Sequence, residues 1–418
     1  MFNKRSTDIA VLGAGPVGLA ASHGLLANGV EHCLFEQAGG VHSHSYALAL
    51  HPNTMERLHG LGLSERILAH ALRVERIAVY DREERKLELN CSQMAVDYPF
   101  ITVIGQNHLE EILATALEQR RHAPLWHHRG RLGPDFLDSM RLEVDRLYTG
   151  ITGYAVAHWA TQVDKTYNYD LNYVLGTDGL ESSVRRLLGA EFYEQGPAQE
   201  YAVFEFKVDG ELPQELRLIL ADDKTHVFWP MPDGYCRWSF QVPSGHLLRG
   251  QREGTQSLVQ QGPYSYPLLD SKHLAALLDE NAPWFKLKPG QIRWRTVVRF
   301  QNRLADRFGA GRLWIAGDAA HTGPPAGMLS MNNGICAALD WVDCLVRGRD
   351  ATERETAMAE CAEKWRERWL RSFLLETVVK RRNRLFSWLG EHMHQLAGNI
   401  PLAPEQVLEL LEGAELPD

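Results

Sequence analysis

A glycine-rich turn near the start of the chain has the residue types and spacing that bind a dinucleotide. Gly13, Gly15 and Gly18 form the pattern GxGxxG. An apolar run over residues 8–12 precedes it, and a helical pattern follows. The glycines permit a tight turn, close approach of a pyrophosphate to the backbone and close packing of helix on strand. Glu36 ends the next predicted strand, where its carboxylate can accept hydrogen bonds from ribose hydroxyls. These residues predict a dinucleotide site.

Two further segments indicate which dinucleotide is bound. Residues 176–185 read GTDGLESSVR and residues 314–321 read WIAGDAAH. With these three ordered motifs, most of residues 8–347 resembles the single-component flavin-dependent aromatic hydroxylases, the para-hydroxybenzoate hydroxylase-like family. The resemblance implies an FAD cofactor. It places Asp178 where the pyrophosphate lies and the nicotinamide donor approaches, and it assigns the ribityl chain to Asp318. A helix N-cap is the alternative role for Asp318.

The resemblance implies more cofactor contacts around the flavin ring. A loop at residues 324–327 and the helix start after it match segments beside the ring, where helix amides can stabilise negative charge on a reduced flavin. Gln106 matches a glutamine that touches the cofactor in the family. The complete expected FAD set is Gly13, Gly15, Pro16, Gly18, Glu36, Gln37, Gln106, Asp178, Gly317, Asp318, Pro325, Gly327, Met331 and Asn332.

A substrate wall is expected on the strands over residues 227–242. Arg237 matches an arginine that lies near the flavin in the family. Side chains two apart share one face of a strand, and counting back by twos from the strand partner of Arg237 puts Val227, Trp229 and Met231 on one face. Ser239 lies two residues after Arg237 and shares its face. These residues are the candidate substrate contacts, with plain core packing as the alternative. No catalytic residue and no metal ligand set is identified. His42 and His44 lack a third ligand.

Some positions depart from the family pattern. Relatives carry arginines where this chain has Gln37, His44 and Tyr46. The positive charge facing the FAD phosphates is therefore reduced. Either His42 and His44 replace the missing arginines, or the nicotinamide donor docks differently. The arginine usual in DGxxS is Glu181, and a usual glycine of the flavin loop is Ser330, which could change how far the flavin ring swings.

The elements around these motifs predict an α/β fold. A discontinuous Rossmann-like FAD-binding domain carries the glycine motif, and an antiparallel α+β second domain carries the substrate wall. An amphipathic helical region follows, expected to pack on the body and less readily to lie on a membrane surface. The predicted boundaries are 1–73, 106–190 and 301–347 for the FAD-binding domain, 74–105 and 191–300 for the substrate domain, and 348–418 for the C-terminal helical region.

Composition narrows the function classes. The 418 residues carry 53 acidic and 44 basic side chains, a net charge of −9, which argues against a nucleic-acid partner. Apolar stretches are shorter than the ~20 residues of a membrane span, and no signal peptide is visible. We therefore expect a cytoplasmic monomer or homodimer. The six cysteines include no CxxC pair, so they indicate reduced core residues.

The resemblance implies an FAD-dependent monooxygenase. Such an enzyme uses NAD(P)H and O2 to hydroxylate an aromatic or alkyl-aromatic small molecule through a flavin C4a-hydroperoxide. No second GxGxxG for NAD(P)H is visible, as in that family. The alternatives are a flavin-dependent reductase, oxidase or halogenase of the same fold, and a non-catalytic flavoprotein that sequesters an intermediate. The residues FWPMP at 228–232 do not match the WxWxIP segment of halogenases.

Overall fold

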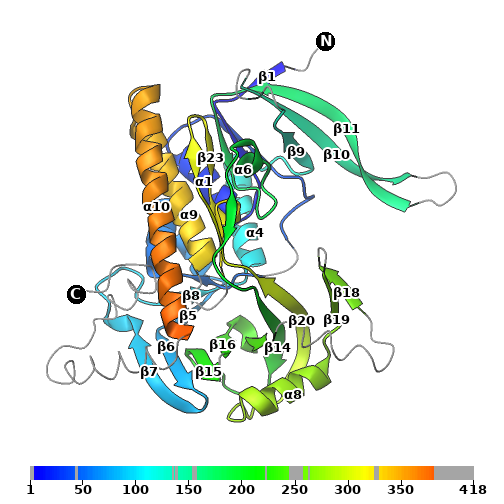
Figure 1. Cartoon of the computed structure of the whole chain (residues 1–418), viewed down its shortest axis with the longest axis vertical. Coiled ribbons are helices and arrows are strands. Elements are labelled where there is room, and N and C mark those ends of the chain that lie inside the picture. Colours follow the sequence, from blue (N-terminus) through cyan, green and yellow to red (C-terminus); the bar gives the residue numbers. More distant parts are fainter. Residues whose placement is uncertain are drawn as a thin grey trace.

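The computed structural model shows a mixed α/β molecule with a long helix along one side (Figure 1). It describes residues 4–42, 46–133, 136, 140–152, 158–221, 224–243, 258–261, 264–323 and 329–380.

The sheet expected from the glycine motif has the strand order β22-β23-β12-β2-β3. β2 (Ile9–Leu12) pairs in parallel with β3 (His32–Phe35) and with β12 (Tyr173–Gly176). β12 also pairs in parallel with β23 (Leu313–Ile315), and β22 (Gly309–Ala310) closes the edge in the antiparallel direction. All residues of β2, β12 and β23 are buried, as expected for parallel strands covered on both faces. The predicted α/β class is confirmed.

Helices cover this sheet. α1 (Pro16–Ala27) packs against α4 (Gln106–Gln119) and α9 (Leu329–Arg347), and α9 packs against α10 (Ala351–Lys380). Figure 1 shows α10, in orange, running beside α9. The helix start expected after the loop at residues 324–327 agrees with α9. The shorter helices are α2 (Pro52–Gly60), α3 (Ser64–Leu68) and α6 (Ser183–Leu187).

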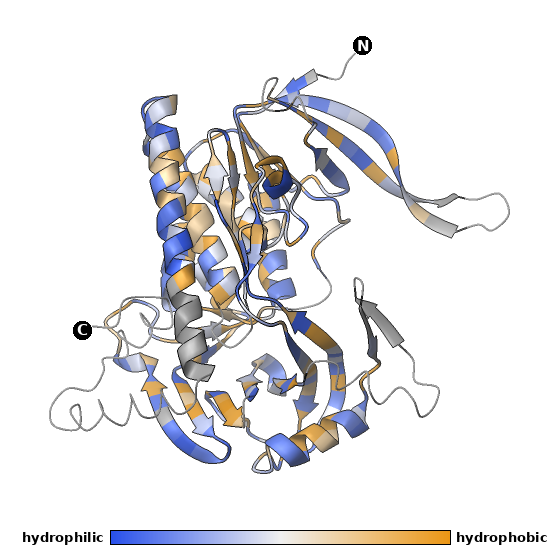
Figure 2. Ribbon diagram, viewed as in Figure 1, coloured by the Kyte–Doolittle hydropathy of each residue, from blue (hydrophilic) through white to orange (hydrophobic). Residues whose placement is uncertain are grey.

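A seven-stranded sheet with the order β20-β14-β17-β16-β15-β6-β7 forms the other half of the molecule. Neighbouring strands are antiparallel as predicted, except that β15 and β6 pair in parallel. α8 (Ser271–Asn281) packs on it, and Figure 2 shows hydrophilic and hydrophobic positions alternating along this helix. The strands are β6 (Arg76–Asp81), β7 (Glu84–Asn90), β14 (Gln199–Val208), β15 (Leu216–Ala221), β16 (Lys224–Pro230), β17 (Tyr235–Val242) and β20 (Pro289–Phe300).

Four small sheets complete the described part of the fold. One includes a long hairpin, β10–β11, that extends away from the body (Figure 1). The strands of this sheet are β1 (Lys4–Ser6), β9 (His128–Arg131), β10 (Arg141–Thr152) and β11 (His158–Asp170). A second small sheet contains β4 (Ala49–Leu50), β5 (Leu72–Val74) and β8 (Ile101–Val103), and a third contains β13 (Phe192–Glu194), β21 (Arg303–Ala305) and β24 (His321–Thr322). The fourth is the pair β18 (Leu258–Gln261) and β19 (Tyr264–Pro267). Short 3-10 turns occur at η1 (Cys91–Gln93), η2 (Pro232–Gly234) and η4 (Gly317–Ala319).

Sheet membership follows the discontinuous pattern expected from the sequence. The parallel sheet takes strands from three distant segments, and β6 and β7 join the same sheet as β14 to β17. The domain boundaries themselves stay a prediction. The C-terminal helix α10 is described to residue 380, and residues 381–418 lie outside the described residues. No described helix combines the length and apolar character that a membrane crossing requires.

Candidate functional site

A cavity of about 780 Å³ lies where the parallel strands end. Leu12 ends β2 and Phe35 ends β3, and both line it, as do Thr177 after β12 and Ala316 after β23. The carboxyl edge of a parallel sheet is where open α/β folds bind ligands. The cavity also reaches residues of β14, β16, β17 and β20, so it joins the two large sheets.

The backbone of the glycine motif packs closely at the edge of the cavity. A Cβ on Gly13, which has φ +101°, would lie 2.3 Å from the Thr177 carbonyl oxygen. A Cβ on Gly18 would lie 1.9 Å from the Gly13 oxygen, so Gly18 packs helix on turn and does not line the cavity. Gly15 lines the cavity and its Cβ position meets nothing within 4 Å. The free amides of α1 therefore open on a space suited to an anion.

Glu36 is fixed by its own turn. One carboxylate oxygen accepts a hydrogen bond from the Ala14 amide and the other from the Ala38 amide, each at 2.8 Å. Glu36 and Gln37 line the cavity, and so does Arg129, which β9 brings in. Arg129 is paired with the buried Asp145 at 3.2 Å. Sequence reasoning missed Arg129 because no local motif marks it.

Asp178 lines the cavity but also builds the start of α6. One carboxylate oxygen accepts hydrogen bonds from the Ser183 amide at 2.7 Å and from the Ser183 hydroxyl at 2.8 Å. Arg185, the last residue of the motif, is buried and donates to the carbonyls of Leu180 and Ala319. The middle motif is thus tied to the segment that carries Asp318.

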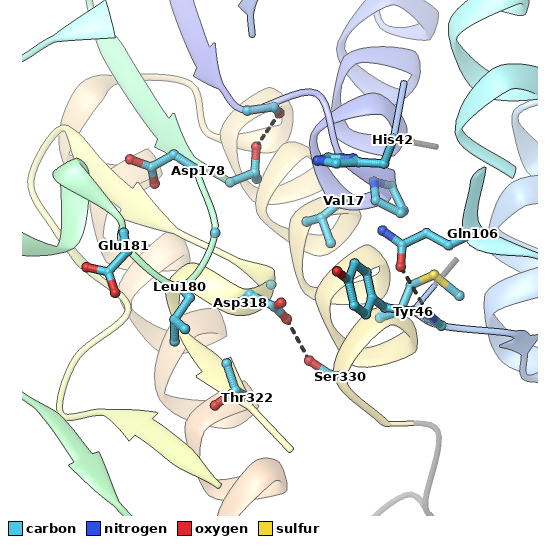
Figure 3. Close-up of a pocket in the computed structure, with 18 of the residues that line it drawn as sticks. Val17, His42, Tyr46, Gln106, Asp178, Leu180, Glu181, Asp318, Thr322 and Ser330 are labelled. Atoms are coloured by element: carbon cyan, nitrogen blue, oxygen red, sulfur yellow. Dashed lines mark hydrogen bonds between the residues drawn. The ribbon is translucent and has the colours of Figure 1, made fainter. Parts of the chain in front are cut away.

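Asp318 faces the cavity beside Gly317, whose φ of +64° lies in the left-handed region that favours glycine. The Ser330 hydroxyl donates to its Oδ1 at 2.8 Å (Figure 3). Desolvation by the surrounding protein raises the pKa of the Asp318 carboxyl, and the Ser330 hydrogen bond opposes this. The bond comes from a side-chain hydroxyl, not from a helix amide, so this contact does not make Asp318 a helix N-cap.

A buried carboxylate on α4 organises the opposite wall. Glu110 is fully buried and accepts hydrogen bonds from the His42 amide at 3.0 Å and the Gln106 side chain at 2.9 Å. His42 Nδ1 lies 3.1 Å from the same carboxylate, and this hydrogen bond raises the pKa of His42. Gln106 Oε1 accepts from the Ala47 amide at 3.1 Å. His42, Gln106 and Tyr46 all line the cavity, as Figure 3 shows.

The expected substrate wall is only partly at the cavity. Trp229, Arg237 and Ser239 line it, whereas Val227 and Met231 do not. Val227 and Met231 do share a cluster with Trp229, but residues of the small β4-β8-β5 sheet cover them, so they pack as core. Val203 and Trp294 also line the cavity, and sequence reasoning missed Val203 because β14 reaches the cavity only through strand pairing.

Arg237 is held rigidly in this wall. Its side chain is 3% exposed, and its Nε donates to Glu205 at 3.0 Å. Its Nη1 donates to the Tyr46 carbonyl at 3.2 Å, and its guanidinium lies 4.6 Å from the centre of the Trp294 ring. Burial lowers the pKa of Arg237, and the Glu205 charge opposes that shift. Arg293 also pairs with Glu205, so the group carries a net positive charge.

Other expected cofactor residues fall in different places. Pro16 and Met331 line the cavity. The Asn332 side chain instead joins α9 to β4 and α2, accepting from the His51 amide and donating to the Ala49 carbonyl. Pro325, Gly327 and His44 lie outside the described residues.

Comparison with known proteins accounts for this arrangement. The model of a family described as FAD binding domain matches residues 6–347. The chain belongs to this family. The expected flavin cofactor and the resemblance to flavin-dependent aromatic hydroxylases are therefore confirmed at the level of the family.

Two relatives and one solved structure illustrate the similarity. The chain is 26% identical to 6-methylpretetramide 4-monooxygenase of Streptomyces rimosus, over 78% of this chain and 53% of that protein. It is 27% identical to pentachlorophenol 4-monooxygenase of Sphingobium chlorophenolicum, over 83% and 60%. The chain thus spans a little over half the length of these relatives. The crystal structure of p-nitrophenol 4-monooxygenase from Pseudomonas putida DLL-E4 superposes with a TM-score of 0.70 at 20% identity, over 99% of this chain and 100% of that one, and shows the shared fold.

Proposed function

We propose that this chain binds FAD in the cavity and uses NAD(P)H and O2 to hydroxylate an aromatic or alkyl-aromatic small molecule. The observation that carries the proposal is one continuous cavity that has a dinucleotide-binding turn on one sheet and an aromatic wall on the other. The names of the relatives as monooxygenases support it.

The residues present fit FAD. The glycine turn leaves no room for side chains at Gly13 and Gly18, and it exposes the amides of α1 to a pyrophosphate. Glu36 presents oxygens held at fixed positions for a ribose, and Asp318 presents a carboxylate for the ribityl hydroxyls. When bound, FAD supplies the redox chemistry with NAD(P)H and O2.

Other positively charged side chains around the cavity could replace the arginines that the family pattern has and this chain lacks. Glu110 favours the protonated form of His42, and His42 lines the same cavity as Val17 at the start of α1 (Figure 3). Arg129 and Arg186 also line the cavity. We propose that His42 contributes the positive charge facing the phosphates. His44 is not described, so its share stays a prediction.

The second sheet supplies the place for substrate. Trp229, Trp294 and Tyr46 give aromatic surface that excludes water, and the Ser239 hydroxyl is available to orient a polar group of the substrate. Arg237 keeps its charge beside this space because Glu205 and Trp294 hold it in place. An electron-rich aromatic ring carrying a hydroxyl group suits this wall. The cytoplasmic location expected from the sequence stays a prediction.

The test is oxygen-dependent NAD(P)H oxidation by the FAD-loaded protein, with and without candidate phenols. We expect a phenol to accelerate oxidation and to leave as a product with one added oxygen atom. Oxidation that no phenol stimulates would favour a reductase or oxidase, and no oxidation at all would favour a non-catalytic flavoprotein. Trp229→Ala is the matched variant, expected to raise KM while FAD binding stays unchanged.

A further inference from the structure

Two thiols face each other between α9 and α10, outside the cavity. All six cysteines fall within the described residues, and none is in a disulfide. Cys344 lies in the last turn of α9, and Cys361 lies at the end of the third turn of α10. Both are partly exposed, whereas Cys91, Cys236 and Cys336 are buried.

The register of the two helices brings these cysteines together. The helices form an antiparallel pair, seen side by side in Figure 1, in which the Trp365 indole donates to Asp340 Oδ2 at 3.1 Å. One turn later on α9 is Cys344, and one turn earlier on α10 is Cys361, so they face each other. Each thiol shifts the pKa of the other, so the two sulfurs lie within interaction range.

Packing keeps Cys361 in this position. Met358, Trp365 and Trp369 are buried, and with Cys361 they follow the spacing of one helix face. Trp369 stacks on His321 with ring centres 4.1 Å apart, which anchors this face of α10 to the segment after Asp318. The two thiols therefore meet in a fixed helix interface.

The surroundings give the two thiols different pKa values. The Cys361 hydrogen bond lowers the pKa of Cys344 to about 7, against the effects of burial, Asp340 and Asp343, and Arg347 assists. The pKa of Cys361 is raised, first by its hydrogen bond to Cys344 and then by burial. Burial raises the pKa of Cys33. Cys344 is thus the nucleophile of the pair at neutral pH, because the thiolate is the reactive form.

We propose that Cys344 and Cys361 are a peroxide-oxidisable pair that closes a reversible disulfide between α9 and α10. The Cys344 thiolate attacks hydrogen peroxide, an S–O bond forms, the O–O bond breaks, and the leaving hydroxide takes a proton to become water. Cys361 then attacks the Cys344 sulfur, the S–S bond forms, the S–O bond breaks, and the Cys361 proton leaves with the second water. The thiols lose two electrons, and the peroxide gains them.

The bond has a structural consequence near the cavity. It ties α10 to α9, whose first turn carries Ser330 and Met331 at the cavity wall. A disulfide across these helices restricts the unfolded chain and so raises stability. A thiol reductant restores the starting state.

The experiment uses the full chain, reduced, desalted and treated with stoichiometric hydrogen peroxide, then alkylated and mapped by mass spectrometry. Trypsin leaves Cys336 and Cys344 in one peptide, because no Lys or Arg lies between residues 313 and 346. Chymotrypsin, which cleaves after Trp341, separates them. Cys361→Ser and Cys344→Ser test the pair, and Cys33→Ser is the control for another partly exposed thiol.

We expect one linked peptide pair that joins Cys344 to Cys361, a higher Tm after oxidation, and reversal of both by dithiothreitol. Cys361→Ser should instead accumulate a sulfenic acid at Cys344 that dimedone traps. Cys33→Ser should behave as the wild type. A link through a different cysteine, or an untouched Cys344 under peroxide that oxidises Cys33, would overturn the proposal. This readout needs neither flavin nor substrate, so it is independent of the proposed function.

Discussion

Replacing Glu205 with glutamine should destabilise the protein because it leaves the Arg237 charge buried without its partner. Both side chains are 3% exposed, so neither charge can regain water without unfolding the wall. Breaking one side of such a buried pair costs about 3–5 kcal/mol. The amide oxygen of Glu205→Gln keeps part of the hydrogen bonding, which places the expected loss near the lower end, about 3 kcal/mol.

Urea unfolding monitored by tryptophan fluorescence measures this loss, and a double-mutant cycle with Arg237→Met isolates the pair. Removing both charges should restore about 2 kcal/mol relative to the sum of the single losses. Arg293→Ala is the matched control. Its side chain is 41% exposed, so losing its pairing with Glu205 should cost less than about 1 kcal/mol. Equal losses for Glu205→Gln and Arg293→Ala, or additive losses in the cycle, would refute the reasoning.

Three further predictions concern the cofactor site and pH. FAD affinity, measured by flavin fluorescence quenching, should fall as pH rises through the raised pKa of His42. The Glu110→Gln substitution should shift this fall in affinity to lower pH. An unchanged pH profile in that variant would contradict the role of Glu110. Gly18→Ala should weaken FAD uptake and lower Tm, since its Cβ would lie 1.9 Å from a backbone oxygen. Gly60→Ala, whose Cβ meets nothing within 4 Å and whose backbone is not left-handed, should leave FAD uptake unchanged.

The third concerns buried histidines that stay neutral in the folded protein and become charged on unfolding. Because unfolding takes up protons, stability should be full above the unfolded pKa of 6.5 and fall as pH drops toward the folded values. Each of these histidines should lower the free energy of unfolding by about 2 kcal/mol at pH 5. A flat Tm between pH 7 and pH 5 would contradict this. Burial lowers the pKa to about 4 in His23, His32 and His226 and to about 3 in His321.

The sequence predicted most of what local chemistry controls. The glycine turn, Glu36 and the parallel strands around them require particular residue types at short spacing, and the structure has these elements in those places. The three motif segments also meet at one cavity, as the resemblance implied. Strand alternation correctly put Trp229 on one face with Val227 and Met231.

The features of the site that could not be predicted from the sequence depend on long-range packing. Alternation cannot tell which end of a buried face meets a cavity and which end a neighbouring sheet covers, so Val227 and Met231 were placed too near the substrate. Arg129 and Val203 reach the cavity from strands without a motif. The Glu110 network joins residues 68 positions apart, and no pattern within one helix shows its partner.

FAD titration of the wild-type chain and Asp318→Ala tests the central claim most directly. The wild type should become yellow and bind FAD at one site, and Asp318→Ala should raise the Kd by about 10- to 100-fold, the worth of a hydrogen bond to a charged group. Tm of the cofactor-free proteins serves as the control for folding. A wild-type protein that takes up no FAD, or a folded Asp318→Ala variant with unchanged Kd, would contradict the account.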